Sequence, residues 1–495
     1  MDMQISIHGR QDLTGQIYRQ LRAGIIDGRL ASGERLPSTR DLAGQLGVSR
    51  KTTLEVFERL ITEGYLRAHP GDGTFVADGL SRVPNRAGQA RGAATTQTAA
   101  AAADTTDTAD LASAHSVWAE VPEALSMPQY RPALPFDFRG GVTDKTQFPF
   151  DAWRRCVNHA VRVQARSRGE YRDPGGEQEL RLGISRYVAF SRAVSCSWQD
   201  VIVTQGAQQA LDLLARVVVK PGDIVAMEDP GYPPARAAFA ALGASVVGVP
   251  VDAHGLITAK LPCRAALVYV TPSHQFPLGM PMSLERRVEL LEWAEKHHVV
   301  IVEDDYDCEF RFEGRPMESL KSLDRAGLVA YVGTFSKTIF PELRIGYVVP
   351  PRSLNVALQK AKQIGDWHTC TLTQTALARF MLDGDFARHL RRIHKHYAAR
   401  RQMLLSHLHG ALAQWLEPLP SAAGIHLTAL LKAGLEEAPL IAAAAEAASV
   451  GLYGIAAFYT SEPKRQGLIF GYGGTSAEDI DTALQRLAGV LQQAR

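Results

Sequence analysis

The chain has 495 residues, more than one hydrophobic core usually organises, which indicates two or three domains. Its 54 lysines and arginines against 52 acidic residues give a formal net charge of +2. Overall charge therefore predicts no nucleic-acid partner, and any DNA binding must come from local charge. No run approaches the roughly 18 apolar residues of a membrane span, and no secretion signal opens the chain. We expect a cytoplasmic protein that makes no contact with a membrane.

The cysteines support the same compartment. Five are present, an odd number, and none lies in the spacing of a zinc or redox motif. They predict free thiols in a reducing environment and no metal site. These residues are Cys156, Cys196, Cys263, Cys308 and Cys370.

Residues 1–80 alternate helical patterns with tight turns. A first helix is predicted by apolar residues at a spacing of four. A second begins where Ser38 can cap and Asp41 completes a capping-box pattern. A third follows a short turn, with Ser49 as N-cap and Gly64 as C-terminal stop. The residues expected on the inner faces of the first and third helices are Leu13, Ile17, Leu21, Ile25, Leu54, Phe57, Leu60 and Ile61.

Two strand-like pieces follow, residues 65–68 and 74–77, and the turn Pro-Gly-Asp-Gly at 70–73 would join them as a hairpin wing. In such a fold the N-terminal end of the third helix enters the major groove of DNA. Residues 35–59 hold five basic and three acidic side chains, so the positive charge is local. The alternative is a three-helix protein-binding module with a solvated charged face, but the wing and both caps would then be coincidences.

This segment contains three distinctive sequence motifs. Residues 30–43 read LASGERLPSTRDLA, residues 46–50 read LGVSR and residues 71–76 read GDGTFV. Together they resemble the GntR-type winged helix across the whole of residues 10–77. The resemblance implies binding to a double-stranded DNA operator, with a wing that reaches the adjacent minor groove. The implied DNA contacts are Arg40, Arg50, Lys51 and Thr52, with His69 and Gly71 in the wing.

The composition changes after residue 80. Alanine, threonine, aspartate and glycine dominate residues 87–114, with almost nothing to anchor a core, so residues 81–135 are predicted to form a flexible linker. From residue 136 onward, short apolar runs alternate with amphipathic helical stretches, which predicts a buried, mostly parallel α/β sheet. The clearest strand-like runs are residues 201–204, 266–270 and 299–302.

The most informative segment is YVGTFSKT at residues 331–338, where a strand ends in a turn of small residues that presents Lys337. A partly desolvated lysine there can form a Schiff base with an aldehyde. Asp304 and Tyr306 follow the strand at 299–302 and suit a pyridine nitrogen and a ring oxygen. The sequence Gly-Ala-Gln-Gln at 206–209 opens a helix, and free backbone amides at a helix start suit a phosphate.

Each of these features alone has a plainer interpretation. A lysine after a strand is most often a surface residue, acidic clusters are usually solvated loops, and Gly-Ala-Gln-Gln could open any helix. Their order along the chain, phosphate loop, acid and then lysine, makes the combination stronger. That order and the residues of each motif resemble the fold-type I aminotransferases, specifically the MocR/GabR regulators that join them to a GntR-type domain. The resemblance covers essentially all of residues 136–490 and implies one aminotransferase-like domain at 136–495.

The resemblance also implies the cofactor pyridoxal 5'-phosphate (PLP) and a homodimer. Lys337 would be the Schiff-base lysine, Asp304 would lie opposite the pyridine nitrogen, and Tyr306 would lie at the ring oxygen. Tyr232 would stack on the ring, and Tyr171 would reach across the dimer to the phosphate of the other subunit. The residues implied around the phosphate are Gly206, Ala207, Gln208, Thr334, Ser336 and Arg344.

Three departures from the aminotransferase pattern bear on function. Phe276 stands where transaminases usually keep an asparagine, and Pro234 stands where GABA-responsive members have an arginine. Near the C-terminus, residues 467–472 lack the arginine that clamps a substrate carboxylate, and Arg465 or Lys464 is only a loose substitute. Because a bidentate arginine is the usual way to recognise a carboxylate, an ordinary α-amino-acid substrate is disfavoured.

Three hypotheses follow. The leading one is a PLP-dependent DNA-binding transcriptional regulator that senses an amine or amino-acid effector, or PLP itself, through Lys337. The second is an active PLP-dependent aminotransferase with an appended DNA-binding domain, supported by Lys337, Asp304 and Arg344. The third is a DNA-binding protein with a scaffold that no longer binds the cofactor, against which the intact cofactor residues argue.

Overall fold

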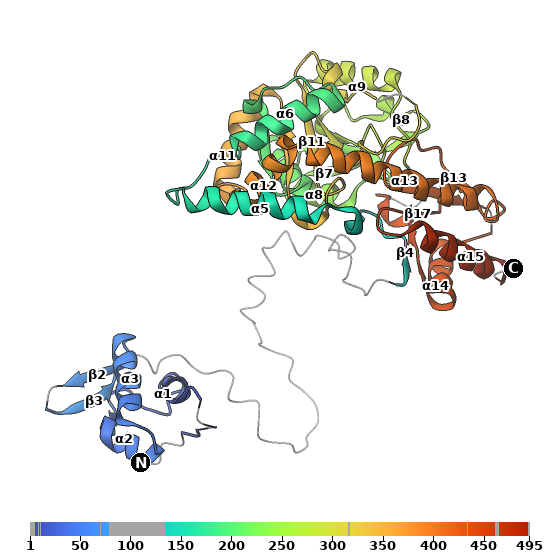
Figure 1. Ribbon diagram of the computed structural model, residues 1–495. Helices are drawn as coiled ribbons and strands as arrows, with labels where there is room; N and C mark the ends of the chain where they lie inside the picture. The colour runs from blue at the N-terminus through green and yellow to red at the C-terminus, as the bar shows by residue number, and fades with distance from the viewer. Residues whose placement is uncertain are drawn as a thin grey trace, which may run out of the picture. The chain divides into compact units, whose positions relative to one another are not determined.

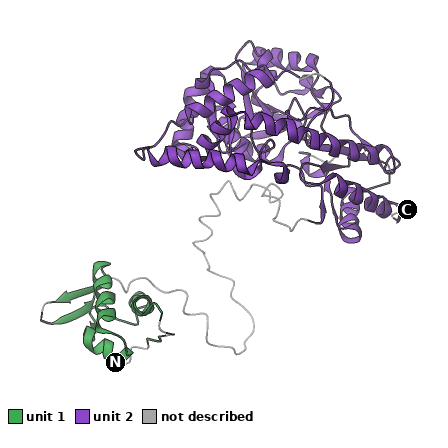
Figure 2. Cartoon of the chain, viewed as in Figure 1, with its two compact units in different colours: residues 1–105 green, residues 106–495 purple. Residues whose placement is uncertain are grey.

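The computed structural model describes residues 5–7, 9, 11–69, 71–78, 134–314, 317–432, 434–460 and 465–493. They belong to two compact units, one within the first 105 residues and one within the remainder (Figure 2). The predicted linker lies almost entirely outside the described residues. Within the described parts of the chain, no helix is both long and apolar enough to cross a membrane.

The first unit consists of three helices and a small antiparallel sheet, as the sequence predicts. The sheet has the strand order β1-β3-β2, in which β2 and β3 form the wing. The sequence did not predict β1, because a strand of two residues carries no periodicity. The elements are α1 (Leu13–Ile26), β1 (Arg35–Leu36), α2 (Thr39–Leu46), α3 (Arg50–Thr62), β2 (Leu66–His69) and β3 (Gly73–Val76).

Both predicted helix caps are present. The hydroxyl of Ser38 accepts from the amide of Asp41 at 3.2 Å, and that of Ser49 accepts from the amide of Thr52 at 3.1 Å. One inward residue was wrong, because Leu54 is 45% exposed. The buried stripe of α3 is instead Thr53, Val56, Phe57 and Leu60, and Leu54 lies about 100° around the helix from Thr53.

The cap at Ser49 gives a first testable expectation. Ser49→Ala leaves the amide of Thr52 without its side-chain acceptor, so we expect the opening free energy of α3 to fall by about 1 kcal/mol. Hydrogen exchange of the α3 amides in the full-length protein measures this value. Ser49→Asp keeps an acceptor and should exchange like the wild type; equal protection in the alanine variant would contradict the capping role.

The second unit is built on an eight-stranded sheet with the order β5-β12-β11-β10-β9-β6-β7-β8. Neighbouring strands from β11 to β7 are parallel, whereas β12 and β8 run antiparallel to their neighbours, which confirms a mostly parallel sheet. The strands are β5 (Ile202–Thr204), β6 (Ile224–Asp229), β7 (Ser245–Asp252), β8 (Gly255–Leu256), β9 (Ala265–Val270), β10 (Val300–Asp305), β11 (Val329–Thr334) and β12 (Gly346–Val349).

Helices cover both faces of this sheet (Figure 1). Successive strand residues point to opposite faces: Val302 packs with α7, α8 and α11, whereas Ile301 packs with α9. Tyr331 faces α5, α6 and α12. The helices are α5 (Phe150–Ala165), α6 (Gln178–Arg192), α7 (Ala207–Val218), α8 (Pro233–Ala240), α9 (Leu284–His297), α10 (Leu320–Leu323), α11 (Arg352–Asp366), α12 (Thr371–Leu382) and α13 (Asp385–His409).

A smaller antiparallel sheet, order β13-β14-β17-β16, follows in the chain and has its own core with α13, α14 and α15. A short parallel pair, β4 and β15, ties the start of the unit to this part. These elements are β4 (Phe136–Asp137), β13 (Leu416–Pro418), β14 (His426–Leu431), α14 (Glu437–Ala448), β15 (Val450–Gly451), β16 (Tyr453–Gly454), β17 (Gly467–Gly471) and α15 (Ala477–Gln493).

Candidate functional site

Lys337 and Asp304 come from adjacent parallel strands. Asp304 pairs in register with Val332, so the end of β10 and the turn after β11 lie at the same edge of the sheet. The Lys337 Nζ donates to the carbonyl oxygen of Gly141 at 3.2 Å. Burial lowers the pKa of the Lys337 ammonium, which increases the fraction of neutral, nucleophilic amine at a given pH.

The Asp304 carboxylate is only half satisfied. Its Oδ2 accepts from the Tyr269 hydroxyl at 2.8 Å, whereas its Oδ1 is buried and has no hydrogen-bond partner among the described residues. Burial raises the pKa of Asp304 to about 7. A buried acceptor without a donor is costly, so this oxygen marks a place for a ligand's N–H group.

Asp304 also predicts a pH-dependent stability. Its pKa rises from an ordinary value of 3.8 to about 7 in the fold, so its contribution is complete below about pH 4 and is lost as pH rises through 7. The side chain of the Asp304→Asn variant cannot ionise, so the variant does not lose this stability as the pH rises. In protein stripped of small molecules at pH 8, we expect the variant to melt about 2–4 °C above the wild type, by calorimetry. At pH 4 most of the difference should be gone; an equal difference at both pH values would contradict this assignment.

The residues expected to bind a phosphate lie on neighbouring strands. The pairing of Thr334 with Gly346, and of Gly346 with Thr204, brings the ends of β11, β12 and β5 together. Gly206 opens α7 with φ +77°, and no side chain caps this helix. A Cβ on Gly206 would lie 2.7 Å from Arg344 Nη2. A helix start with free amides beside a guanidinium has the chemistry to bind an anion.

The other residues expected around the phosphate differ in their burial and in their hydrogen-bond partners. Ser336 and Thr334 are buried and hydrogen-bonded to each other through their hydroxyls at 3.0 Å. Arg344 is exposed and its Nη2 donates to the carbonyl oxygen of Gln205 at 2.9 Å. Ala207 lies at the first turn of α7, but the Gln208 side chain turns toward α8 and donates to the carbonyl oxygen of Pro234 at 3.0 Å.

Aromatic rings lie near Asp304. Tyr232 immediately precedes α8, and burial raises its pKa to about 12. The Phe276 ring meets the Tyr232 ring edge to face, with centroids 5.4 Å apart, and lies 6.2 Å from the ring of Tyr306. The Tyr306 hydroxyl donates to the carbonyl oxygen of His274 at 2.9 Å. Phe276 therefore offers an apolar edge where an asparagine was expected from the family pattern.

Sequence reasoning missed a buried polar group next to Tyr306. His274, Asp307 and His426 bring potential metal-ligating atoms within 4.8 Å of one another. However, His274 Nδ1 lies 3.0 Å from Asp307 Oδ1, and His426 Nε2 lies 3.2 Å from the carbonyl oxygen of Pro277. These contacts favour a closed hydrogen-bond network over a metal centre. The position of Asp307 directly after Tyr306 was the available sequence signal.

The strand on which aminotransferases present the carboxylate-binding arginine is apolar in this chain. Ile469 of β17 packs with Leu278, Ile455 and Tyr459. Arg465 is exposed, and Lys464 lies outside the described residues. The strand β17 itself contains no arginine.

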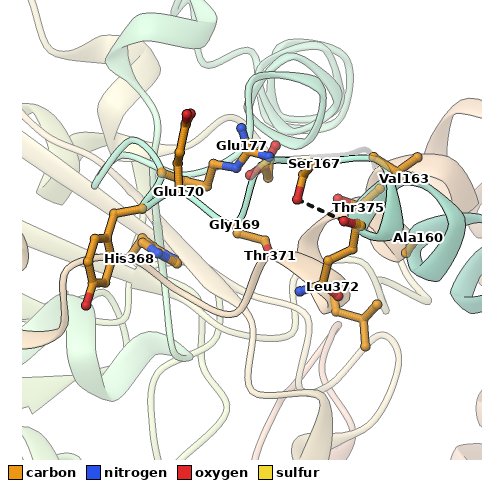
Figure 3. Close-up of a pocket in the computed structure, with 13 residues that line it drawn as sticks. Ala160, Val163, Ser167, Gly169, Glu170, Glu177, His368, Thr371, Leu372 and Thr375 are labelled. Atoms are coloured by element: carbon orange, nitrogen blue, oxygen red, sulfur yellow. Dashed lines mark hydrogen bonds between the residues drawn. The ribbon is translucent and has the colours of Figure 1, made fainter.

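Tyr171 lies apart from Lys337, on the surface. It is 73% exposed and stacks on Trp367 with ring centroids 4.4 Å apart. The same residue lines a cavity of about 390 Å³ between the end of α5 and the start of α12. Figure 3 shows Gly169 and Glu170 on one side of this cavity, with Thr371 from α12 nearby. The cavity contains none of the residues at Asp304 and so is not the candidate cofactor pocket.

In the first unit, the residues expected to contact DNA lie on α2, α3 and the wing. Arg40, Arg50 and Lys51 are exposed, and Thr52 is half-buried with its hydroxyl 2.8 Å from that of Ser49. The exposed His69 ring packs against Phe75 at 5.5 Å. Gly71 turns the wing with φ +85°.

Comparisons with known proteins agree with both units. Residues 13–76 match the model for bacterial regulatory proteins of the gntR family, and residues 141–487 match the model for aminotransferase class I and II. Kynurenine aminotransferase of Pyrococcus horikoshii, solved in complex with PMP, superposes with a TM-score of 0.68 at 26% identity. That match covers 79% of this chain and 97% of the aminotransferase.

Regulators match over nearly the whole chain. The probable rhizopine catabolism regulatory protein MocR of Rhizobium meliloti is 36% identical over 473 residues, 95% of this chain and 92% of that protein. The HTH-type pyridoxine biosynthesis transcriptional regulator PdxR of Corynebacterium glutamicum is 29% identical over 485 residues, 98% of this chain and 96% of that protein. The chain therefore belongs to the MocR-type regulators, DNA-binding transcriptional regulators that join a GntR helix-turn-helix domain to an aminotransferase class I and II domain.

Proposed function

We propose that this regulator binds PLP covalently at Lys337, and that an amine or amino-acid effector, or PLP itself, changes its affinity for a DNA operator through this site. The observation that carries the proposal is the buried, unpartnered Oδ1 of Asp304 beside the desolvated Lys337. When bound, PLP supplies an aldehyde that reacts with amines and a pyridine ring that withdraws electrons. The protein supplies the binding, orientation and electrostatics.

The surrounding residues have distinct roles in this proposal. Asp304 Oδ1 would accept a hydrogen bond from the protonated pyridine nitrogen, and that positive partner would keep the carboxylate ionised. Tyr232 would cover one face of the ring, and Tyr306 would serve the ring oxygen. The amides at the start of α7 and nearby side chains would hold the phosphate. These residues are Gly206, Ala207, Gln208, Thr334, Ser336 and Arg344.

We further propose that two copies form a homodimer in which Tyr171 reaches the phosphate of the other subunit. The support is an exposed apolar surface around Tyr171 and its stacking partner Trp367, unusual for a free monomer. The protein works in the cytoplasm, where its operator is located. The exposed apolar residues of α5, α11 and the loop after α11 include Phe150, Val161, Val163, Val356, Ile364 and Trp367.

A charge in this surface should disrupt the dimer. Trp367→Arg replaces a stacked ring that is half exposed with a cation, so we expect the dimer dissociation constant to rise at least about tenfold. Sedimentation velocity over a concentration series measures it. Leu284→Arg, at a somewhat more exposed site at the start of α9, is the control and should remain dimeric. A Trp367 variant that dissociates like the wild type would exclude this surface from the dimer interface.

The alternative is a working aminotransferase. Lys337, Asp304 and Arg344 support it, but the apolar wall at Ile469 offers no bidentate partner for a substrate carboxylate. Multiple turnovers of an amino donor with an oxo-acid acceptor would favour the enzyme.

The proposal is tested on the full-length protein with visible spectroscopy and DNA binding together. We expect added PLP to produce a visible absorption band, candidate amines to shift it, and operator affinity to change over the same concentrations. Fluorescence anisotropy of labelled operator DNA gives the affinity. A PLP-saturated protein with no band would refute covalent binding, and a band with constant operator affinity would refute sensing.

A further inference from the structure

A buried ion pair on α11 is connected to the turn that opens α7. Lys362 Nζ lies 2.9 Å from each carboxylate oxygen of Asp366, and the Lys362 side chain is 0% exposed. Asp366 Oδ2 also accepts from the side-chain amides of Gln209 at 2.7 Å and Gln205 at 3.2 Å. Burial lowers the pKa of Lys362, and the hydrogen bond and charge of Asp366 oppose that change. Because lysines are almost never fully buried without a partner, Lys362 depends on Asp366.

The two glutamines fix the turn around Gly206. Gln209 Oε1 accepts from the backbone amide of Gln205 at 2.8 Å, and Lys362 Nζ donates to the same oxygen at 3.3 Å. The backbone amides that would hold a phosphate at the start of α7 lie between these two glutamines. Asp366 therefore holds this phosphate turn, residues 205–209, from both of its ends.

Asp366 also begins a strained turn on the opposite side. The amide of His368 donates to the carbonyl oxygen of Asp366 at 2.7 Å, and Trp367 between them has φ +63° and ψ −65°. This combination is the rare, strained form of the γ-turn. A bulky residue keeps such a backbone only where its surroundings hold it. Those surroundings are the network of Asp366 on one side and, on the other, the ring of Tyr171, with centroids 4.4 Å from Trp367.

A second connection joins the segment of Tyr171 to the phosphate turn. The amide of Val203 in β5 donates to the carbonyl oxygen of Gly175 at 2.8 Å. Strand β5 ends at Thr204, directly before the phosphate turn. The segment 171–175 is thus tied to this turn through β5 and through the stacked ring of Trp367.

We propose that Asp366 is a positioning residue with two tasks. Through Gln205 and Gln209 it holds the phosphate turn in the shape that binds the phosphate of the cofactor. Through the turn at Trp367 it holds the surface on which a second copy of the chain docks. This inference rests on the PLP site and the homodimer proposed above, and it assigns the ordering of both to one carboxylate.

The first test is Gln209→Met in the full-length protein. Methionine has a similar length but no amide, and the substitution leaves the ion pair of Lys362 and Asp366 intact. We expect the PLP concentration that half-saturates the visible band to rise about tenfold. The value for pyridoxal, which has no phosphate, should stay unchanged. A general loss of structure would weaken both ligands alike.

The second test is the double variant Lys362→Met, Asp366→Ala. It removes both charges, so no unpaired charge remains buried. In cofactor-free protein we expect the dimer dissociation constant to rise about tenfold, because the turn at Trp367 loses its anchor. Gln209→Met keeps that anchor and should dimerise like the wild type. Sedimentation velocity over a concentration series measures both variants.

A matched ion pair at the end of another helix provides the control. Arg379 Nε lies 2.8 Å from Asp383 Oδ2, four residues later at the end of α12. Among the described residues, neither side chain is hydrogen-bonded to the phosphate turn or to the turn at Trp367. The double variant Arg379→Met, Asp383→Ala should therefore keep wild-type values for PLP, pyridoxal and the dimer.

The outcomes distinguish this inference from the proposed function. A wild-type protein with no visible band overturns PLP attachment, and a monomeric wild type overturns the homodimer. With a normal band and dimer, Gln209→Met that loses PLP and pyridoxal affinity equally, or neither, overturns the phosphate task.

A wild-type dimer constant in Lys362→Met, Asp366→Ala overturns the surface task. If that variant does not fold, hydrogen exchange of the cofactor-free wild type replaces it. A protected amide at His368 supports a held turn, and exchange at the rate of an unstructured chain overturns it.

Discussion

Lys337→Ala is expected to abolish the visible absorption band of the PLP-treated protein and, with it, every PLP-dependent or amine-dependent change in operator affinity. The alanine has no amine to form a covalent bond, whereas the pocket residues remain in place. PLP would then be held only by non-covalent contacts, such as those at the start of α7 and at Asp304. We expect weak binding that dialysis removes. Absorption spectra before and after dialysis, with anisotropy of labelled operator in parallel, measure both effects.

The control for this variant is another lysine near the site. Lys145 is exposed and ion-paired with Glu342, so Lys145→Ala should keep the band and the operator response. Operator affinity that still responds to PLP in Lys337→Ala would locate sensing elsewhere in the protein. A dialysis-resistant band in that variant would assign the covalent bond to a different amine.

The second large effect concerns DNA. The double variant Arg50→Ala, Lys51→Ala removes two exposed cations from the N-terminal end of α3. At about 1–3 kcal/mol for each side chain that binds DNA, operator affinity should fall at least about thirtyfold. The dependence of log affinity on log salt should also become shallower, by about one for each phosphate that the variant no longer neutralises. Anisotropy titrations at several salt concentrations give both values.

A matched arginine elsewhere in the same unit provides the control. Arg19 lies on α1, is largely exposed, and forms only a surface ion pair with Asp12, so Arg19→Ala should change operator affinity little. The visible band of the double variant should also match the wild type, because its substitutions lie in the other unit. Unchanged affinity in the double variant would mean that α3 is not the recognition helix.

The sequence predicted the elements that have strong local signals. The helix caps at Ser38 and Ser49 are determined locally, because each serine side chain accepts a hydrogen bond from the amide three residues later. Both caps are present. Lys337 and Asp304 each follow a continuous apolar run, and parallel strands necessarily place such ends at one edge. Leu54 was wrongly predicted to face inward. Its residue type suits a core, but successive residues of a helix point about 100° apart, and Leu54 lies outside the buried stripe.

The contacts between distant parts of the chain could not be predicted from the sequence in the same way. Asp307 accepts a hydrogen bond from the Ile425 amide, more than a hundred residues away in the chain. That approach needs a glycine at position 424, where a Cβ would lie 2.7 Å from Asp307 Oδ2. The pattern also identified the missing arginine, but not that Ile469 packs into an apolar wall. The rotation of the Gln208 side chain toward Pro234 depends on how α7 and α8 pack. Such features depend on distances across the fold, which local periodicity does not encode.

The division of the second unit between two sheets has an evolutionary consequence. Lys337, Asp304 and Arg344 belong to the large sheet and its turns, whereas Ile469 belongs to the small sheet and packs in a cluster that contains no residue of β10, β11 or β12. Mutations in the small sheet can therefore accumulate without disturbing the strands that carry the lysine. Such a lineage can exchange the chemical signal to which it responds while it inherits the same reactive centre.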